Sequence, residues 1–435
     1  MTDRHSLDGM VAPDWSDPAI KARLKRRHNG TLRLKLGGIG AICVALGLLA
    51  LLLGSILSIG LKAFSQTMVR IDVPISASYI NADDLSESNW NRLAQEGVAT
   101  LFPDDATGRR DSRYRNILSR GGVHMVRQSI EQQVTADPSL IGSTVSVSVQ
   151  LSDPFDQFDK GVVRRDTPEA TRRISDAEMG MFDQLVSEGR IERVFNRWLF
   201  TNGDSRFPEM AGLAGGLRGS AMALMVCLLI SFPVGIAAAI YLEEFAPKNW
   251  LTDIIEININ NLAAVPSIVF GLLGLAVFLN FFGLPRSAPL VGGMVLALMT
   301  LPTIIIATRA ALKAVPPSIR EGATGLGASR VQVVTHHVMP LAMPGILTGT
   351  IIGLAGALGE TAPLLLIGMN MFSTDLPSGV FDQATALPTQ IFMWFDSPEL
   401  GFISRTAAAI IVLLGFLLTM NALAIFLRSR LERRR

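Results

Sequence analysis

Long apolar stretches alternate with polar segments along the chain. Six stretches lack Asp, Glu, Lys and Arg for long enough to cross a bilayer, which takes about 20 helical residues. They are residues 36–61, 219–242, 257–285, 287–308, 331–359 and 406–427. Because His336, His337 and Pro340 delay the fifth, we place its membrane part at 344–369, with Glu360 inside it. The pattern predicts an all-α polytopic membrane protein with about six transmembrane helices.

Lys and Arg near the helix ends predict the orientation, because cytoplasmic ends carry an excess of them. Eight lie in residues 1–35 and five follow residue 427, whereas residues 370–404 have none. The first apolar stretch is longer than the roughly 7–15 residues of a signal-peptide core, so it is interpreted as an uncleaved span. We expect a multi-pass protein of the cytoplasmic (inner) membrane, with both termini and the basic tail 429–435 in the cytoplasm. Residues 243–256 fit this rule least, because they carry four acidic residues and one lysine.

About half of the charged residues lie between the first two predicted spans. Residues 63–210 contain 17 Lys or Arg and 22 Asp or Glu. Residues 144–151 alternate as a half-buried strand does. Ser175 and Glu178 form a capping-box pattern, which predicts a helix whose apolar positions continue to Leu199. We therefore expect a separable α+β domain outside the cytoplasm, inserted after the first helix and before a transmembrane domain at 211–428.

Composition excludes several classes of function. Hydrophobic residues make up 49% of the chain, only 17% is charged, and a net charge of +2 is not that of a nucleic-acid-binding protein. Cys43 and Cys227 both lie in apolar runs, so we expect neither a disulfide framework nor a metal site, and no cofactor held by this chain. The phosphate-binding loop G-x-x-x-x-G-K-[ST] is missing from the sequence, so the chain is not expected to be an enzyme that hydrolyses ATP.

Residues 316–340 form the most informative polar segment. Two capping-box pairs and two glycines divide it: Ser318 with Glu321, Ser329 with Gln332, and Gly325 with Gly327. Pro340 is expected to begin the next span, since proline suits the first turn of a helix. The spacing predicts two short capped helices joined by a glycine turn at the cytoplasmic surface, whereas an ordinary re-entry loop needs no such construction. We call residues 316–340 the elbow.

The elbow resembles the EAA loop of ABC-importer permeases. Glu321, Gly322 and Ala323 are followed by Gly327 and, thirteen residues later, by Pro340. Gly322, like His337 and Met339, departs from the usual pattern. The resemblance implies that a cytoplasmic ATPase docks on this loop, through Ser318, Glu321, Gly322, Ala323, Gly327, Ser329 and Pro340.

Further segments resemble the PstA-type family of phosphate-uptake permeases, over residues 211–428. They are residues 241–249, 261–275, 359–365, 373–375 and 387–391. The resemblance implies the type I ABC importer permease fold and transport of inorganic phosphate. It also implies three partners: two copies of an ATP-binding subunit, a second phosphate permease of similar fold, and a periplasmic phosphate-binding protein. Residues 1–35 and 63–210 resemble an N-terminal extension found in some members, and the family implies no role for it.

Glu360 is the only acidic residue well inside a predicted span. A charged side chain there costs about 2.5–3.5 kcal/mol, so we expect it to face a pathway or a partner. The alternative is a structural hydrogen bond to a neighbouring helix. Its neighbours Gly359, Thr361 and Pro363 are included in the candidate pathway, because proline locally frees a backbone carbonyl.

Two positions, Gly356 and Arg309, bear on how an anion is bound. Many PstA-type relatives have an arginine four residues before the glutamate, where this chain has Gly356. Arg309 lies at the inner mouth, where it either attracts an anion or only marks the cytoplasmic side. A permease for another oxyanion remains an alternative. So does a membrane-anchored phosphate sensor, although one span would suffice for that.

Overall fold

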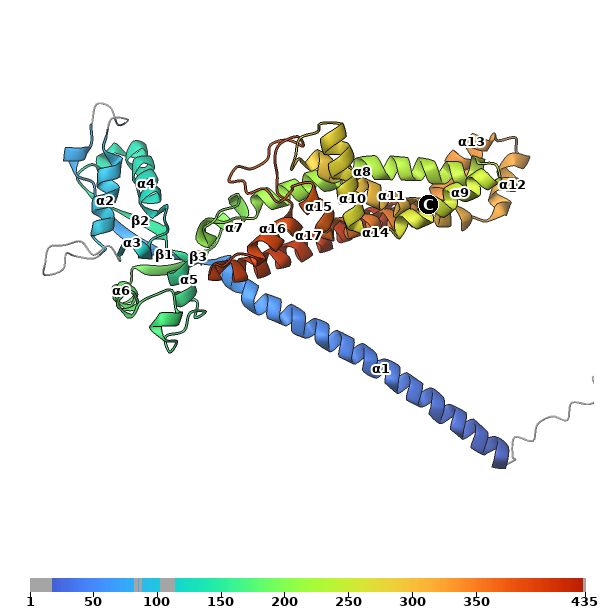
Figure 1. Cartoon of the computed structure of the whole chain (residues 1–435), viewed down its shortest axis with the longest axis horizontal. Helices are drawn as coiled ribbons and strands as arrows, with labels where there is room; N and C mark the ends of the chain where they lie inside the picture. Colours follow the sequence, from blue (N-terminus) through green and yellow to red (C-terminus); the bar gives the residue numbers. More distant parts are fainter. Residues whose placement is uncertain (1–17, 82–84, 86–87, 102–113, 433–435) are drawn as a thin grey trace, which may run out of the picture. The chain divides into compact units, whose positions relative to one another are not determined.

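The computed structural model describes residues 18–81, 85, 88–101 and 114–432, and it divides into two units, Met1–Ser58 and Ile59–Arg435 (Figure 1). Helix α1 (Pro18–Gly60) accounts for the described part of the first unit. Its 43 residues make it about 65 Å long at 1.5 Å per residue, twice the thickness of the hydrocarbon core. The helix therefore extends the predicted first span well into the basic tail.

Four further helices are long and apolar enough to cross a membrane. They are α8 (Ala214–Ile240), α11 (Pro289–Lys313), α14 (Met339–Gly359) and α17 (Leu400–Glu432). Helix α11 packs against both α8 and α14. Glycines permit this close approach: a Cβ at Gly293 would lie 2.5 Å from the Ala223 oxygen, and one at Gly349 would lie 2.2 Å from the Ala307 Cβ.

The predicted third span, 257–285, is not one continuous helix. Helix α9 (Trp250–Ala263) is bent by 104° from the segment Ser267–Phe281, which contains α10 (Ser267–Leu273) and a π-helical stretch. Pro266 precedes α10, and proline disfavours the helical conformation for the residue before it. The sequence-based span is corrected to a broken pair, so the described chain has five continuous candidate spans and one broken one.

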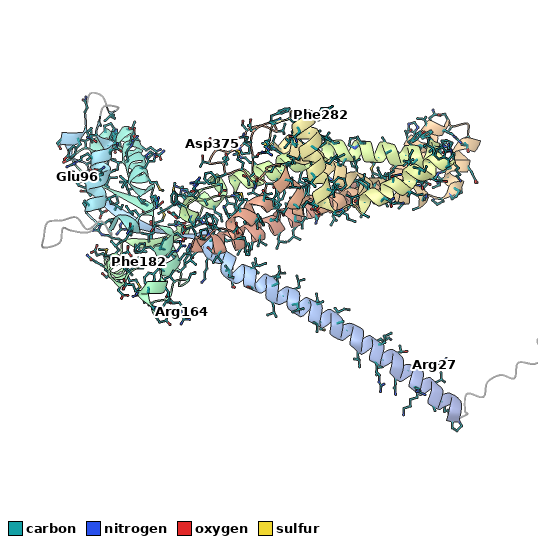
Figure 2. All side chains as sticks on the ribbon, viewed as in Figure 1. Arg27, Glu96, Arg164, Phe182, Phe282 and Asp375 are labelled. Carbon is teal, nitrogen blue, oxygen red and sulfur yellow. The ribbon has the colours of Figure 1, made fainter. Side chains whose placement is uncertain are left out.

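An α+β domain precedes α8. Its antiparallel sheet has the order β2-β1-β3, formed by β1 (Ser65–Pro74), β2 (Thr144–Gln150) and β3 (Ile191–Phe195). Its helices are α2 (Trp90–Ala99), α3 (Tyr114–Ile117), α4 (Gly122–Ala136), α5 (Asp153–Asp159), α6 (Asp176–Ser187) and α7 (Trp198–Thr201). Val69 of β1 pairs with Val149 of β2, and both are fully buried in a core that also contains Phe182 (Figure 2). The predicted strand is confirmed.

The predicted long helix after Ser175 is partly wrong. The capping box of Ser175 and Glu178 is present and begins α6. The helix ends at Ser187, because Gly189 adopts a positive φ of 66°, and the following residues form β3 instead. Val194, which we expected on the helix, therefore pairs with Gln66 in the sheet.

The α+β domain shares contacts with the transmembrane core. One apolar cluster combines Ala63 and Leu199 with Trp394 of α16 (Leu387–Phe395) and Phe402 of α17. The Trp394 indole donates a hydrogen bond of 2.8 Å to the buried Asp204 carboxylate. These contacts argue against the expectation that residues 63–210 can be removed as a separate unit.

Candidate functional site: the elbow and the helix break at Glu360

The first helix of the elbow is α12 (Pro317–Gly325). Its N-cap is Pro316, and Ser318 makes no capping hydrogen bond, so the predicted Ser318–Glu321 capping box is wrong. Pro317 takes the first helical position, where its missing N–H is not needed, and the helix begins earlier than the capping pattern indicated. Gly325 is the last residue of the helix and does not form the turn.

Gly327 forms the turn between the two halves of the elbow. Its φ is +86°, a conformation that glycine adopts without strain, as the sequence predicts. Its N–H donates to the Thr324 oxygen at 2.9 Å, and the Ala328 N–H donates to the Ala323 oxygen at 3.1 Å. These bonds satisfy the last carbonyls of α12 and fix the direction of the chain.

The second half of the elbow continues directly into the membrane helix. The predicted capping box of Ser329 and Gln332 is confirmed and begins α13 (Arg330–Gln332). A π-helical turn, Val333–Val338, then joins α13 to α14, so Arg330–Gly359 is one continuous helix. Pro340 therefore lies inside this helix and does not mark its start. The wider π turn, with i→i+5 bonds, replaces the α-helical bond pattern just before the proline.

The elbow presents an exposed tip over a buried base. Leu326 is 91% exposed, and Glu321 and Gly322 are also exposed. Ala323 faces the other way, into an apolar cluster with Val315 and Val333. Among the large apolar side chains of the described segments Leu326 is the most exposed, so the tip of the elbow is a candidate contact point for another protein.

Arg309 is not a free cation. Its guanidinium donates to Glu243 at 3.3 Å and to Glu256 at 2.5 Å, and Lys313 lies 3.5 Å from Glu243. The acidic segment 243–256, which fitted the charge rule least, thus supplies the ion-pair partners of Arg309 and Lys313. The excess of acidic residues in this segment was the feature of the sequence that indicated these ion pairs. A pathway role for Arg309 stays a prediction.

Glu360 lies at a break between helices. Helix α14 ends at Gly359, Glu360 has an extended backbone (φ −74°, ψ 123°), and α15 (Ala362–Leu366) begins after Thr361 with Pro363 in its first turn. The predicted continuous membrane segment 344–369 is therefore wrong, because Pro363 cannot continue the hydrogen-bond ladder of α14.

The surroundings of Glu360 are open. A Cβ placed on Gly356 or Gly359 would meet no atom within 4 Å apart from its chain neighbours and the nearby backbone of α14. The half-buried Glu360 side chain has no hydrogen-bond or ion-pair partner within residues 18–81, 85, 88–101 and 114–432. The structural hydrogen bond that we considered from the sequence is thus not observed in the described chain. A carboxylate beside two bare glycines suits a group that meets a ligand or another subunit.

Two helix breaks adjoin the same apolar cluster. Val265, at the break between α9 and α10, packs against the cluster that contains Ala357 and Leu358 of α14 and Leu364 of α15. Breaks in membrane helices are tolerated where the backbone is buried in protein or lines a cavity. Thr361 and Pro363 lie at the second of these breaks, and their part in a translocation pathway stays a prediction.

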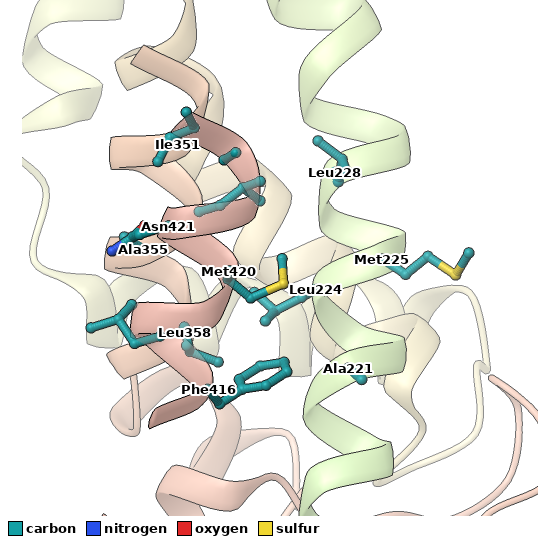
Figure 3. Close-up of a pocket in the computed structure, with 13 residues that line it drawn as sticks. Ala221, Leu224, Met225, Leu228, Ile351, Ala355, Leu358, Phe416, Met420 and Asn421 are labelled. Carbon is teal, nitrogen blue, oxygen red and sulfur yellow. The ribbon is translucent and has the colours of Figure 1, made fainter. Parts of the chain in front are cut away.

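A groove of about 370 Å³ lies between α8, α14 and α17 (Figure 3). Leu224, Leu358 and Phe416 line it, and Asn421 is the only side chain with an amide among its lining residues. It offers no cation and too few N–H donors to hold an oxyanion. Nor do any three His, Cys, Asp or Glu side chains of the described segments come together as a metal would require.

The sequence reasoning missed a buried charge cluster at the start of α17. Arg405 is 4% exposed; it donates to the Ala211 oxygen at 2.6 Å and to the Gln66 side chain at 3.2 Å. Asp153 accepts from the Gly401 N–H at 3.1 Å. Arg405 lies one residue before the predicted span 406–427, where a basic residue is common, so the sequence did not indicate that its side chain is buried.

Two other acids and a lysine complete the cluster. Asp156 forms an ion pair of 2.6 Å with Lys160, whose ammonium also donates to the Ser65 oxygen. Glu209 is buried nearby. Burial raises the pKa of Asp153 and of Glu209, and burial lowers the pKa of Lys160. The cluster thus joins three parts of the α+β domain to the transmembrane core.

Residues 231–435 match the family model described as binding-protein-dependent transport system inner membrane component. The phosphate transport system permease protein PstC of Haemophilus influenzae is 33% identical over 49% of this chain and 74% of that protein. The chain belongs to this permease family. PstA of Yersinia pestis is 32% identical, over 49% of the permease and 71% of that protein. Residues 21–169 match a domain of unknown function, DUF3333.

Both the PstA and the PstC names therefore occur among the relatives, at similar identity. A solved methionine ABC transporter, MetNI, is also similar, with 15% identity, a TM-score of 0.41, and coverage of 50% of this chain and 95% of that chain. Family membership confirms the predicted recognition and the fold class, an all-α polytopic permease of the type I ABC importer kind with an added α+β domain. The protein is a multi-pass membrane permease component.

Proposed function

We propose that this permease is the transmembrane subunit of an ATP-driven importer that moves inorganic phosphate across the cytoplasmic membrane. Its partners in this proposal are two copies of a cytoplasmic ATP-binding subunit, a second phosphate permease of similar fold and a periplasmic phosphate-binding protein. Both termini and the elbow face the cytoplasm. The chain hydrolyses no ATP itself.

The geometry of the elbow carries the proposal. It is a short, rigid projection between two membrane helices, with its base buried and Leu326 bare at its tip. A subunit that receives movement from a separate ATPase needs such a stiff contact. A sensor would not need it, and neither would a carrier driven by an ion gradient.

The choice of substrate rests on the relatives and on the open site. Several similar proteins are named as phosphate transport system permeases. Monohydrogen phosphate keeps an O–H donor, and the unpartnered Glu360 carboxylate is an acceptor for it. Sulfate has no such donor, so Glu360 gives a physical reason for preferring phosphate over that oxyanion.

The proposal is tested by purifying the permease with the proposed partner subunits and measuring ATP hydrolysis and phosphate uptake in liposomes. Phosphate-loaded binding protein should stimulate both. Burying one leucine is worth about 1.5–3 kcal/mol, so Leu326→Ser should weaken binding of the ATPase roughly tenfold to a hundredfold. Val162→Ser, in the α+β domain, is the matched control and should bind normally. Phosphate binding by the 63–210 domain without any uptake would favour the sensor instead.

A further inference from the structure

Two neighbouring glutamates end the first helix of the transmembrane core. Glu243 and Glu244 lie in the π-helical turn Tyr241–Phe245, which extends α8 without a break. Both side chains are largely buried, with 17% and 12% of their surface exposed. Acids at this end of a helix are unfavourable to its dipole, so their presence calls for specific partners.

Glu244 is bound by the elbow. Arg320 of α12 donates to its carboxylate from Nη2 at 2.8 Å and from Nε at 3.3 Å. The same guanidinium donates from Nη1 to the Val315 oxygen at 2.7 Å and from Nη2 to the Leu312 oxygen at 2.9 Å. One planar, charged group therefore holds the end of α8, the end of α11 and the elbow helix in a single arrangement.

Glu243 is bound by α11 instead. Its carboxylate forms ion pairs with Arg309 and Lys313, and Arg309 forms a further ion pair with Glu256 of α9. The two glutamates thus divide their partners: one ties α8 to its membrane neighbours and the other ties α8 to the elbow. Apolar packing supports the second tie, since Ala323 of α12 shares a cluster with Ile236 and Ile240 of α8.

We propose that Arg320 is the positioning residue that makes α12 and the C-terminal turn of α8 move as one body. Movement imposed on the elbow then enters the membrane through α8, and not only through α14, to which the elbow is covalently joined. This inference rests on the proposed function, because it names the route by which the ATPase drives the transmembrane core. The forked contacts of arginine are essential to it, because Arg320 makes four hydrogen bonds, whereas an ammonium has three N–H donors and an amide has two.

The first test measures distances in the full chain and needs no partner subunit. Spin labels are placed at Pro247→Cys, beyond the π-helical turn, and at the exposed Thr324→Cys on α12, in a Cys43→Ser background that leaves the buried Cys227 in place. In nanodiscs the unmodified pair should give one narrow distance distribution. Glu244→Gln and Arg320→Gln should each broaden it about twofold, whereas Lys248→Gln, which removes an exposed cation from the same loop, should not. Equal widths in all four proteins would overturn the proposal.

The second test adds the ATPase. The distance between the labels should stay the same with and without ATP, and a shift upon ATP binding would show that α12 moves independently of α8. In liposomes, Glu244→Gln and Arg320→Gln should lower phosphate uptake per ATP at least about tenfold while the ATPase remains bound, and the double variant should be no worse than either. If the losses of uptake in the two single variants multiplied in the double variant, Glu244 and Arg320 would act independently, and the proposal that they form one mechanical link would be contradicted. If the unmodified complex takes up no phosphate, the proposed function fails, and the nanodisc distances still decide the mechanical inference.

Discussion

Replacing Arg405 with methionine should unfold the junction between the α+β domain and α17. Three buried acids, Asp153, Asp156 and Glu209, surround two buried cations: Lys160 forms an ion pair with Asp156, and Arg405 interacts electrostatically with all three acids. Methionine retains most of the apolar volume but leaves one cation for three acids. Removing one partner of a buried charge cluster costs about 3–5 kcal/mol, because the remaining charge is neither paired nor solvated.

The controls separate charge from geometry. Arg405→Lys keeps the charge and loses one of the forked hydrogen bonds, so we expect a loss of about 1–3 kcal/mol. Arg173→Met removes a partner of Glu399 at the same junction, but this pair is about 40% exposed, and its loss should cost less than about 1 kcal/mol. Adding Asp153→Asn to Arg405→Met should recover part of the loss, since the two groups are coupled.

The assay is denaturant unfolding of the full chain in mixed micelles, followed by tryptophan fluorescence. Trp394 packs against Phe402 of α17, with ring centroids 5.5 Å apart, so its emission reports on this junction. An Arg405→Met protein within about 0.5 kcal/mol of the unmodified chain would refute the reasoning. It would mean that the cluster is hydrated or that the α+β domain is not held to the core by these charges.

Three further predictions concern the elbow, the helix break and pH. Gly327→Val should abolish uptake with the protein still folded, because a β-branched residue resists the φ of +86° by about 1–2 kcal/mol or more; normal uptake would exclude a rigid turn. Glu360→Gln should relax phosphate-over-sulfate discrimination about fivefold to a hundredfold with assembly intact, if Glu360 is a selectivity acceptor. If it pairs with an arginine of the second permease, uptake falls through misassembly and discrimination is unchanged; full uptake with unchanged discrimination would exclude both roles. Because burial raises the pKa of Glu209 above its usual 4.5, its stabilising effect is complete below about pH 4.5 and is lost as pH rises through the raised pKa. Glu209→Gln should remove that part of the pH slope of the free energy of unfolding, and an unchanged slope would contradict burial of the charge.

The sequence predicted the features that depend on local chemistry. Charge-free stretches identified the membrane helices, alternation identified the strand 144–151, and the box of Ser329 with Gln332 identified a helix start. Gly327 was assigned its turn correctly, because only the backbone of a glycine adopts that conformation cheaply. Each of these signals lies within a few residues of the element that it predicts.

The errors arose where a proline, or packing against residues distant in the sequence, determines the backbone conformation. Hydropathy alone does not show a bend, so the break at Pro266 and the end of α14 before Glu360 were both missed. Pro340 was taken as a helix start, although a π-helical turn accommodates it inside a longer helix. Arg405 and the third strand are stabilised by residues more than a hundred positions away, and no local pattern indicates such partners.

The measurement that tests the central claim most directly is uptake of radiolabelled phosphate into liposomes that contain this permease with the proposed ATPase, second permease and binding protein. We expect uptake that requires ATP, exceeds sulfate uptake, and falls when Leu326 is replaced by serine because the ATPase binds more weakly. Uptake that continues without ATP or without the ATPase, or a complex that transports sulfate as well as phosphate, would contradict the account.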